Sequence, residues 1–211
     1  IYVVLAKALA EGEGYRYLHL PGAPPGVHFP ILYPAVLSLL WRMWPAFPQN
    51  VALFQLFDSA ALAVAAGLIA KHACRWNIPP VVQYVSLPLA FVAFPLLTIV
   101  GVRFSEPLFL ALLAGALVLA DRDEVSGARG AAAGLLAGLA ALTRSIGIAA
   151  VASIPVVLWL GGNRKPAVAA LIGSVALLGP WVIWLFLHGD AVDSRIASNY
   201  GTYLAAAGQT G

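Results

Sequence analysis

The sequence predicts an all-α protein: a polytopic transmembrane helical bundle with amphipathic surface helices in an external loop. Two observations support this prediction. Hydrophobic residues make up 61% of the 211 residues and charged residues only 10%, whereas a soluble domain usually carries about 25% charged residues. Apolar runs of membrane-spanning length also recur along the chain. Together these observations argue against a soluble protein with a large core.

Composition narrows the function classes as well. The net charge is only +3 and the basic residues are scattered, so no nucleic-acid partner is expected. Cys74 is the single cysteine, which excludes an internal disulfide and a cysteine-based metal site. The chain opens at Ile1 inside an amphipathic pattern, without the basic start of a signal peptide, and we interpret it as a segment of a longer protein.

Hydropathy predicts about five or six spans within a bundle covering residues 49–188. The apolar stretch 130–160 would reach roughly 46 Å as one helix, longer than a hydrocarbon core of about 30 Å. Arg144 and its polar neighbours interrupt this stretch. We therefore expect two short helices that meet at Arg144. The other expected spans are residues 51–71, 80–102, 105–120 and 166–187.

Basic residues in the short connections predict the orientation, because cytoplasmic connections carry the excess of Lys and Arg. One set of alternate connections contains Lys71, Arg75, Arg122, Arg129, Arg164 and Lys165. The opposite set contains Arg103, Arg144 and Arg195. The first set should be cytoplasmic, so the turns "GVRFSEPLF" and "LTRSIG" are expected outside.

Residues 1–48 are expected to form an external loop with two juxtamembrane helices, and residues 189–211 to begin another external loop. Residues 1–10 fit a surface helix with Lys7 and Glu11 paired at i,i+4. Its apolar face collects Ile1, Tyr2, Leu5 and Leu9. After a Gly/Pro-rich break, "FPILYPAVLSLLWRMW" ends in tryptophans, which are typical of a helix at headgroup level.

Glu106, in "GVRFSEPLF", has two interpretations. Ser105 is a good N-cap, and Glu106 and Pro107 suit a first helical turn, where a carboxylate complements the helix dipole. Alternatively, the carboxylate lies at the rim of an external cleft and binds a polar substrate or a cation. The two interpretations are compatible, because a helix end is also a rigid platform.

Arg144 lies between two apolar helix halves. It either anchors the turn by snorkelling or holds a lipid-linked phosphate, for which its planar fork of donors is suited. Arg103 has the same two interpretations, and Glu106 offers it a neutralising partner three residues further on.

Further candidates lie elsewhere in the chain. Asp58, about eight residues inside the first span, marks either a functional site or a pair with an Arg of a neighbouring helix. His28, next to "FPILYP", and Tyr33 within it are candidate substrate-binding residues, and no metal ligands are expected. Gly134 and Gly138 are spaced for close helix packing.

Several segments, in this order, resemble the GT-C superfamily of membrane glycosyltransferases, and within it the branch of protein O-mannosyltransferases and aminoarabinose transferases. The segments are "YVVLAKALAEGEGY", "HFPILYPAVLSLLW", "RFSEPLFLALLAGALVLADR", "AGLLAGLAALTRSIG" and the Pro-Trp of "LLGPWVIWLFLHGD".

The resemblance implies an enzyme that transfers a sugar from a polyprenyl-phosphate-linked donor to an acceptor on the outer or lumenal face. Glu106 matches an acidic position of the cavity and is the catalytic candidate in this chain. Arg103 and Arg144 match basic positions near the donor phosphate. The family's general base, an Asp, precedes the segment that matches residues 1–12, so it falls before Ile1.

The expected partners are the lipid-linked sugar donor, membrane lipids and a glycan, lipid or protein acceptor whose identity the sequence leaves open. No cofactor is certain, and a divalent cation is left open. The expected location is an integral multi-pass protein of a prokaryotic plasma membrane, with its active face external or lumenal.

Two rival functions stay open. A secondary transporter predicts inverted repeats and ionisable residues near the midplane, but no convincing repeat is visible and only Asp58 lies deep in a span. A non-catalytic membrane assembly protein would use Arg103, Glu106 and Arg144 only as anchors.

Overall fold

The structure, a computed structural model, describes residues 1–76, 78–82, 85, 89, 104–121 and 124–189. Within these ranges the regular elements are helices and no strand is present, which confirms the all-α prediction. The elements are α1 (Tyr2–Glu11), α2 (Leu32–Met43), α3 (Val51–Arg75), α6 (Glu106–Ala120), α7 (Gly127–Thr143), the 3-10 turn η1 (Ser145–Gly147), α8 (Ile148–Leu160) and α9 (Arg164–His188).

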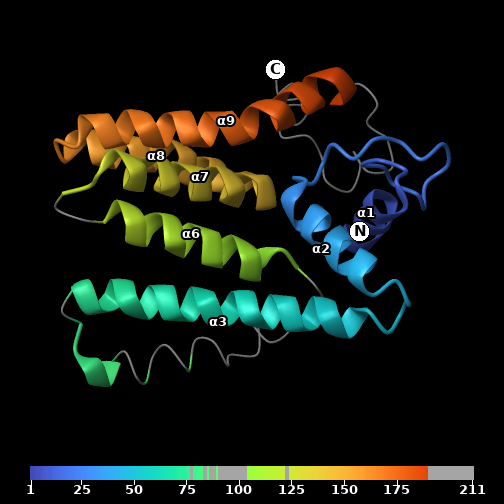
Figure 1. Cartoon of the computed structure of the whole chain (residues 1–211), viewed down its shortest axis with the longest axis horizontal. Helices are drawn as coiled ribbons and strands as arrows, with labels where there is room; N and C mark the ends of the chain where they lie inside the picture. Colours follow the sequence, from blue (N-terminus) through green and yellow to red (C-terminus); the bar gives the residue numbers. More distant parts are fainter. Residues whose placement is uncertain (77, 83–84, 86–88, 90–103, 122–123, 190–211) are drawn as a thin grey trace, which may run out of the picture.

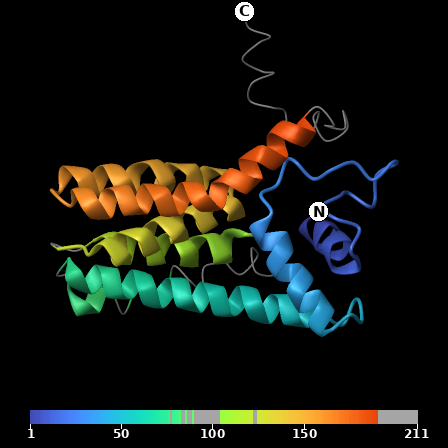
Figure 2. The ribbon, with the colours of Figure 1, turned by 45° about the horizontal axis from the view of Figure 1, so that its top comes forward.

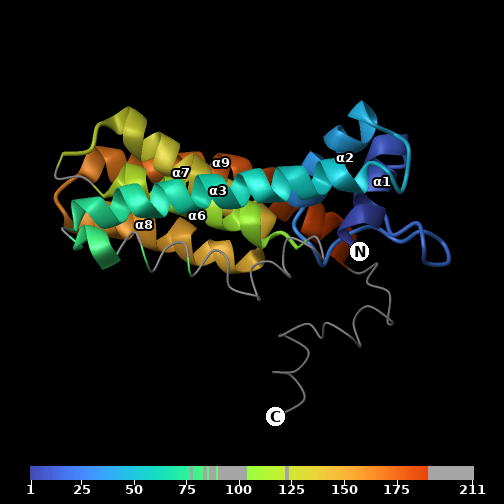
Figure 3. The same cartoon turned by 90° about the horizontal axis from the view of Figure 1, so that it is seen from below.

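Helices α3, α6, α7, α8 and α9 lie alongside one another, and the N-terminal region covers one end of them (Figure 1). The neighbouring pairs among them are α3 with α6, α6 with α7, α7 with both α8 and α9, and α8 with α9. We call the end where α3 and α6 begin and α7 ends the capped end, because α1, α2 and the loop between them lie there. The opposite end, where α3 and α6 end and α7 and α9 begin, is the basic end. Figure 3 shows the same arrangement from below.

Basic residues gather at the end of the bundle that we call the basic end. Among the described residues it gathers Lys71, His72, Arg75, Arg129, Arg164 and Lys165, which lie at the ends of α3, α7 and α9. Of the basic residues assigned to the short connections, the described ones lie as the sequence predicted, with Lys71, Arg75, Arg129, Arg164 and Lys165 at the basic end and Arg144 at the capped end. The capped end also carries Lys7, Arg16 and Arg42 in the N-terminal region.

The predicted break at Arg144 is confirmed. α7 ends at Thr143, Arg144 is extended with φ −145° and ψ 136°, and α8 begins at Ile148 after η1. The chain can fold back tightly here because Gly147 lacks a side chain: a Cβ would come within 2.5 Å of the backbone nitrogen of Ala141.

Two of the predicted spans are shorter than the helices that the structure shows. α3 continues to Arg75 and α9 begins at Arg164, whereas hydropathy placed these boundaries at residues 71 and 166. The reason is that hydropathy shows only where the side chains cease to be apolar. The backbone hydrogen bonds of a helix continue through polar residues, so the helix extends beyond that point. The predicted span 80–102 lies largely outside the described residues, as do Arg122, Arg195 and the loop from residue 190 onward.

Small residues bring α7 and α9 into close contact, as the spacing of Gly134 and Gly138 predicted. A Cβ on Gly134 would collide with the backbone of Ala170 in α9. The hydroxyl of Ser174 lies 2.9 Å from the carbonyl oxygens of both Gly134 and Ala170. Side chains larger than these would separate the two helix backbones.

The N-terminal region is fastened to the C-terminal end of α9. Trp184 donates from its indole nitrogen to the carbonyl of Gly26 at 3.0 Å, and Trp181 packs edge-on against Tyr15. Pro180 lies inside α9, and the helix bends as it approaches the capped end (Figure 2). An interior proline removes a backbone hydrogen bond and kinks a helix. The kink turns the tryptophans toward the loop between α1 and α2.

Among the described residues, two helices are long and apolar enough to cross a membrane, α3 and α9, each with 25 residues. Only 28% and 17% of their apolar windows is buried within the described structure. The apolar side chains that remain exposed on them include Leu56, Val64, Ile172, Ile183 and Phe186.

We expect Gly134→Ala to destabilise the fold by about 1–3 kcal/mol, because the added methyl forces α7 away from the backbone of α9. The control is Gly67→Ala in α3, where an added Cβ meets nothing within 4 Å. That change should raise stability by about 0.5–1 kcal/mol through helix propensity alone. Thermal unfolding of the detergent-solubilised protein measures both. Equal behaviour of the two variants would contradict the close contact.

Candidate functional site

The capped end brings polar side chains from five separate segments toward one another. Glu106 begins α6 and Arg144 follows α7, while Tyr33 and Asp58 lie on α2 and α3. Tyr2 of α1 contacts Tyr33 and also Ser105, the residue before Glu106. Four residues that the sequence singled out therefore lie in the part of the bundle that α1 and α2 cover.

Glu106 forms an ion pair with Arg144, between Oε1 and Nη1. Both side chains are partly buried, with 26% of Glu106 and 36% of Arg144 exposed. The second carboxylate oxygen, Oε2, is inaccessible and has no hydrogen-bond partner among the described residues. A buried acceptor without a partner costs about 1–3 kcal/mol, and more when it is charged. The site thus has an acceptor atom that a ligand or another residue can satisfy.

The sequence also offered Glu106 as a neutralising partner for Arg103, and that expectation stays a prediction. Arg103 lies outside the described residues, and Arg144 is the partner that the structure shows. The sequence could not indicate the pair, because the two residues come from different helix ends that only the packing of α6 against α7 brings together.

Ser105 occupies the N-cap position of α6 and Glu106 its first turn, as the sequence predicted, but the Ser105 side chain does not cap the helix. Ser105 has φ −78° and ψ −2°, already helical, and makes no side-chain cap hydrogen bond. An N-cap side chain reaches the helix amides from an extended backbone, so this conformation prevents capping. The fully buried hydroxyl of Ser105 instead donates to the Tyr2 hydroxyl oxygen at 3.2 Å.

Asp58 is fully buried in α3, and the Tyr33 hydroxyl lies 3.1 Å and 2.9 Å from its two carboxylate oxygens. Tyr33 is itself fully buried and packs edge-on against the ring of Tyr2, with centroids 5.1 Å apart. Tyr2 therefore joins the Tyr33–Asp58 pair to Ser105, the residue before Glu106. The sequence suggested either a functional site or an Arg partner for Asp58, and the hydrogen bond from Tyr33 was not predicted.

His28 lies in the loop between α1 and α2. Both of its ring nitrogens are inaccessible and lack hydrogen-bond partners within the described part of the chain. Burial disfavours the charged imidazolium and lowers the pKa of His28 below its ordinary value of 6.5. The neighbouring residue Phe29 accepts a hydrogen bond from Tyr15 at 2.8 Å, which fixes the loop beside His28.

Tyr2 and Ser105 are the site residues that sequence reasoning missed. Tyr2 was assigned to the apolar face of a surface helix, and Ser105 to a cap. The sequence signal that could have identified Tyr2 is its hydroxyl on an otherwise apolar helix face. A tyrosine hydroxyl usually forms a hydrogen bond when its ring is buried.

Two of the larger cavities lie away from the ion pair. A groove of about 640 Å³ between α1 and α2 is lined by Lys7, Glu11, Trp41, Arg42 and Phe47, among others. A cleft of about 420 Å³ lies at the basic end. Neither is lined by Glu106 or Arg144. In the described ranges, no group of three His, Cys, Asp or Glu side chains is placed to hold a metal ion.

Comparison of the chain with protein-family models, with curated proteins and with solved structures finds no match. The chemistry of the site must therefore be argued from its own groups. A carboxylate with one unsatisfied oxygen can accept a proton or a hydroxyl hydrogen bond, and a guanidinium can stabilise a phosphate or a developing negative charge.

We expect the folded protein to lose stability as the pH falls below 6.5, because the unfolded chain then protonates His28 while the folded chain resists it. His28→Gln should flatten this part of the pH dependence. Melting temperatures between about pH 7.5 and pH 5 measure the effect. His19→Gln, in the same loop but exposed, is the control and should leave the pH profile unchanged. An unchanged profile in His28→Gln would contradict the assignment.

Proposed function

We propose that this chain is part of a GT-C-type membrane glycosyltransferase, which transfers a sugar from a polyprenyl-phosphate donor to an acceptor at the external or lumenal face. The observation that carries the proposal is the Glu106–Arg144 pair, with its unsatisfied buried carboxylate oxygen, at the end of the bundle opposite the basic end.

Membrane insertion is the first part of the proposal. The exposed fraction of α3 and α9 supports it, since the core helix of a soluble protein is mostly buried and these two are not. Large apolar side chains remain exposed along the helices, for example Leu56 at 66%, Ile172 at 63% and Phe186 at 85%. Water would make such surfaces prone to aggregate, whereas lipid tails cover them at no cost. The shorter helices α6, α7 and α8 complete a multi-pass bundle.

The polarity of the two ends supports the orientation. Of the described Lys and Arg residues in short connections, the basic end carries Lys71, Arg75, Arg129, Arg164 and Lys165 and the capped end carries Arg144, and cytoplasmic ends carry such an excess. The capped end, with Glu106 and Arg144, is then external or lumenal. A polyprenyl tail can remain in lipid beside α3 or α9 while its phosphate reaches Arg144 at this end.

The chemistry of the pair fits sugar transfer. As the bond between the sugar and the donor phosphate breaks, negative charge grows on the phosphate, and a guanidinium stabilises it with charge-assisted hydrogen bonds. Glu106 holds Arg144 in place. Its Oε2 is inaccessible in the described structure, so substrate binding has to open the site before this oxygen can accept a hydrogen bond from a hydroxyl of the sugar or acceptor. Asp58 and Tyr33 join α3 to α2, and Tyr2 links Tyr33 to Ser105, the residue before Glu106.

A secondary transporter is the second candidate, because Asp58 is a fully buried carboxylate within a helix long enough to span a membrane. Counterflow uptake of a labelled solute would favour the transporter. Consumption of a lipid-linked sugar by membranes that contain the full-length protein would favour the transferase. If neither activity is found, the result would favour the third alternative, a non-catalytic membrane assembly protein.

We expect Arg144→Gln to lower sugar transfer per folded molecule about 10- to 100-fold, since a hydrogen bond to a charged group contributes roughly 1.5–3 kcal/mol. Arg144→Lys should recover only part of this, because an ammonium keeps the charge but loses the fork. Arg16→Gln is the control, as it removes a charge from an exposed position of the loop.

A double variant separates site from scaffold. Glu106→Gln combined with Arg144→Gln leaves no unpaired charge, so the protein should fold as well as the wild type but stay inactive. A purely structural pair predicts the reverse, namely that the double variant regains full transfer. That result would end the proposed role of the pair.

The orientation has its own test. In a Cys74→Ser background, Glu13→Cys in the loop of the capped end should react with an impermeant thiol reagent in intact cells. Glu124→Cys, exposed at the basic end, should react only after the membrane is permeabilised. The opposite pattern would place the Glu106–Arg144 pair on the cytoplasmic side and would contradict the proposal.

A further inference from the structure

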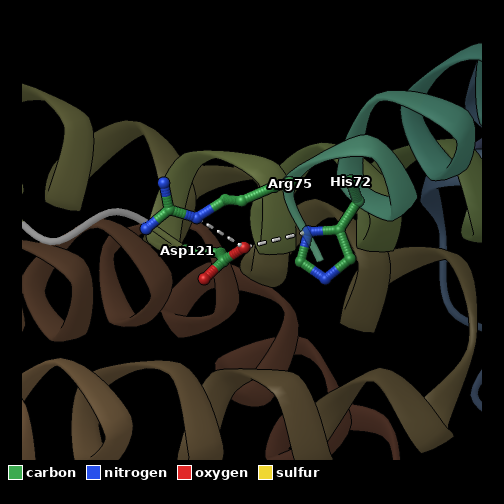
Figure 4. A network of polar contacts seen from close by, with 3 residues as sticks. All are labelled: His72, Arg75 and Asp121. Carbon is green, nitrogen blue, oxygen red and sulfur yellow. Dashed lines mark ion pairs between the residues drawn. The ribbon is translucent and has the colours of Figure 1, made fainter. Parts of the chain in front are cut away.

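The basic end contains positive side chains with and without an ion partner. The Asp121 cluster, made of His72, Arg75 and Asp121, joins the end of α3 to the residue that follows α6 (Figure 4). Oδ2 of Asp121 lies 3.3 Å from Nδ1 of His72 and 3.2 Å from Nε of Arg75. Because the carboxylate of Asp121 pairs with Arg75, the packing of α3 against α6 is sufficient to explain this cluster.

Arg164 and Lys165 lie at the same end without an ion partner. Both are exposed and follow the turn between α8 and α9. Within the described ranges, neither side chain forms a hydrogen bond or an ion pair. Glu124 lies in the connection that contacts this turn, where the Val125 amide donates to Oδ1 of Asn163 at 3.3 Å, but its carboxylate pairs with neither residue. Both positive charges can therefore bind an anion from outside the chain.

Arg164 lies at the end of an apolar groove. Its guanidinium carbon is 5.6 Å from the centroid of the Trp159 ring, a cation–π contact that holds the side chain beside the ring. Trp159 also lines a groove of about 230 Å³ between α8 and α9. A guanidinium has several N–H donors, and those of Arg164 have no acceptor in the described structure. The groove thus has positioned hydrogen-bond donors at the end nearest the turn.

The rest of the groove is apolar. Besides Trp159, its walls are Pro155, Val156 and Leu160 of α8 and Ala167, Val168 and Leu171 of α9. Val168 and Leu171 keep 47% and 48% of their surface exposed, whereas Ala167 is buried. At 1.5 Å per residue, the stretch from Leu160 back to Pro155 makes the groove roughly 7 Å long. This length accommodates the first methylene groups of an acyl chain.

We propose that the groove between α8 and α9 binds an anionic phospholipid of the leaflet at the basic end. The phosphate contacts Arg164 and Lys165, and one acyl chain lies along the groove. Charge complementarity supports this occupant, because an arginine donates charge-assisted hydrogen bonds to phosphate oxygens and basic residues beside membrane helices attract anionic lipids. A free anion would leave the apolar groove empty, and an apolar helix would leave both charges without a partner. The inference rests on the membrane placement in the proposed function, but not on sugar transfer.

Two pairs of variants separate this groove from the rest of the surface. Val168→Phe fills the groove from an exposed position and leaves both charges in place. Val175→Phe is its matched control, because Val175 lies about two turns further along α9, is 55% exposed and does not line the groove. Arg164→Gln removes the charge at the groove, and Arg129→Gln removes the same charge from an exposed position of α7 at the same end.

The experiment uses the full-length protein in detergent and measures the first bound lipid by native mass spectrometry. The probes are phosphatidylglycerol and phosphatidylcholine with the same acyl chains, and inorganic phosphate is the competitor. Phosphatidylglycerol should bind in preference to phosphatidylcholine and should resist the competitor. Arg164→Gln should weaken phosphatidylglycerol binding about 10-fold, and Val168→Phe should weaken it similarly at an unchanged melting temperature. Arg129→Gln and Val175→Phe should stay within about two-fold of the wild type.

Equal losses in Arg164→Gln and Arg129→Gln would reduce the effect to general surface charge and overturn the proposal. Equal binding of the two lipids, or full displacement by inorganic phosphate, would overturn it as well. A protein dimer that Val168→Phe dissociates would show that the groove holds a second copy of the chain instead of a lipid. Failure here with correct thiol labelling of Glu13→Cys and Glu124→Cys would leave the proposed function standing.

Discussion

The close contact between α7 and α9 is the constraint on which the rest of the structure depends. Gly130 and Gly134 expose the backbone of α7 to Pro166 and Ala170 of α9, and the hydroxyl of Ser174 bridges the two helices. In lipid the hydrophobic effect does not drive helices together, so close van der Waals contact between small residues has to do so. Because α7 also contacts α6 and α8, its position sets the position of the helices that carry the polar groups.

The ion pair follows from this packing. α7 ends where the backbone becomes extended at Arg144, and α6 begins at Glu106 beside it. The two side chains meet because α6 begins and the neighbouring antiparallel helix α7 ends at the same level of the bundle. The partial exposure of the pair limits its contribution to stability. A charged pair held at a helix end on the proposed active side is better explained by chemistry than by stability.

The N-terminal region covers the capped end of the bundle. Its aromatic residues pack in two directions: Tyr15 and Gly26 contact the tryptophans of α9, while Tyr33 reaches the buried Asp58 of α3. Tyr2 links this layer to the start of α6 through Ser105. The cap therefore connects α3, α6 and α9 at one end, while the basic end has the separate Asp121 cluster.

The sequence alone determined the helical class, most of the helix positions, the break at Arg144, the small-residue contact and the one-sided distribution of basic residues. All of these are local or periodic properties: apolar run length, glycine spacing and the residues that end a helix. The tertiary structure decided which polar groups meet. Glu106, at the start of α6, pairs with Arg144, which follows α7. The hydroxyl of Ser105 donates to Tyr2 and makes no cap hydrogen bond, and the carboxylate of Asp58 accepts a hydrogen bond from Tyr33. No local pattern encodes such contacts, because each joins residues from different helices whose relative heights are fixed only when the backbones pack.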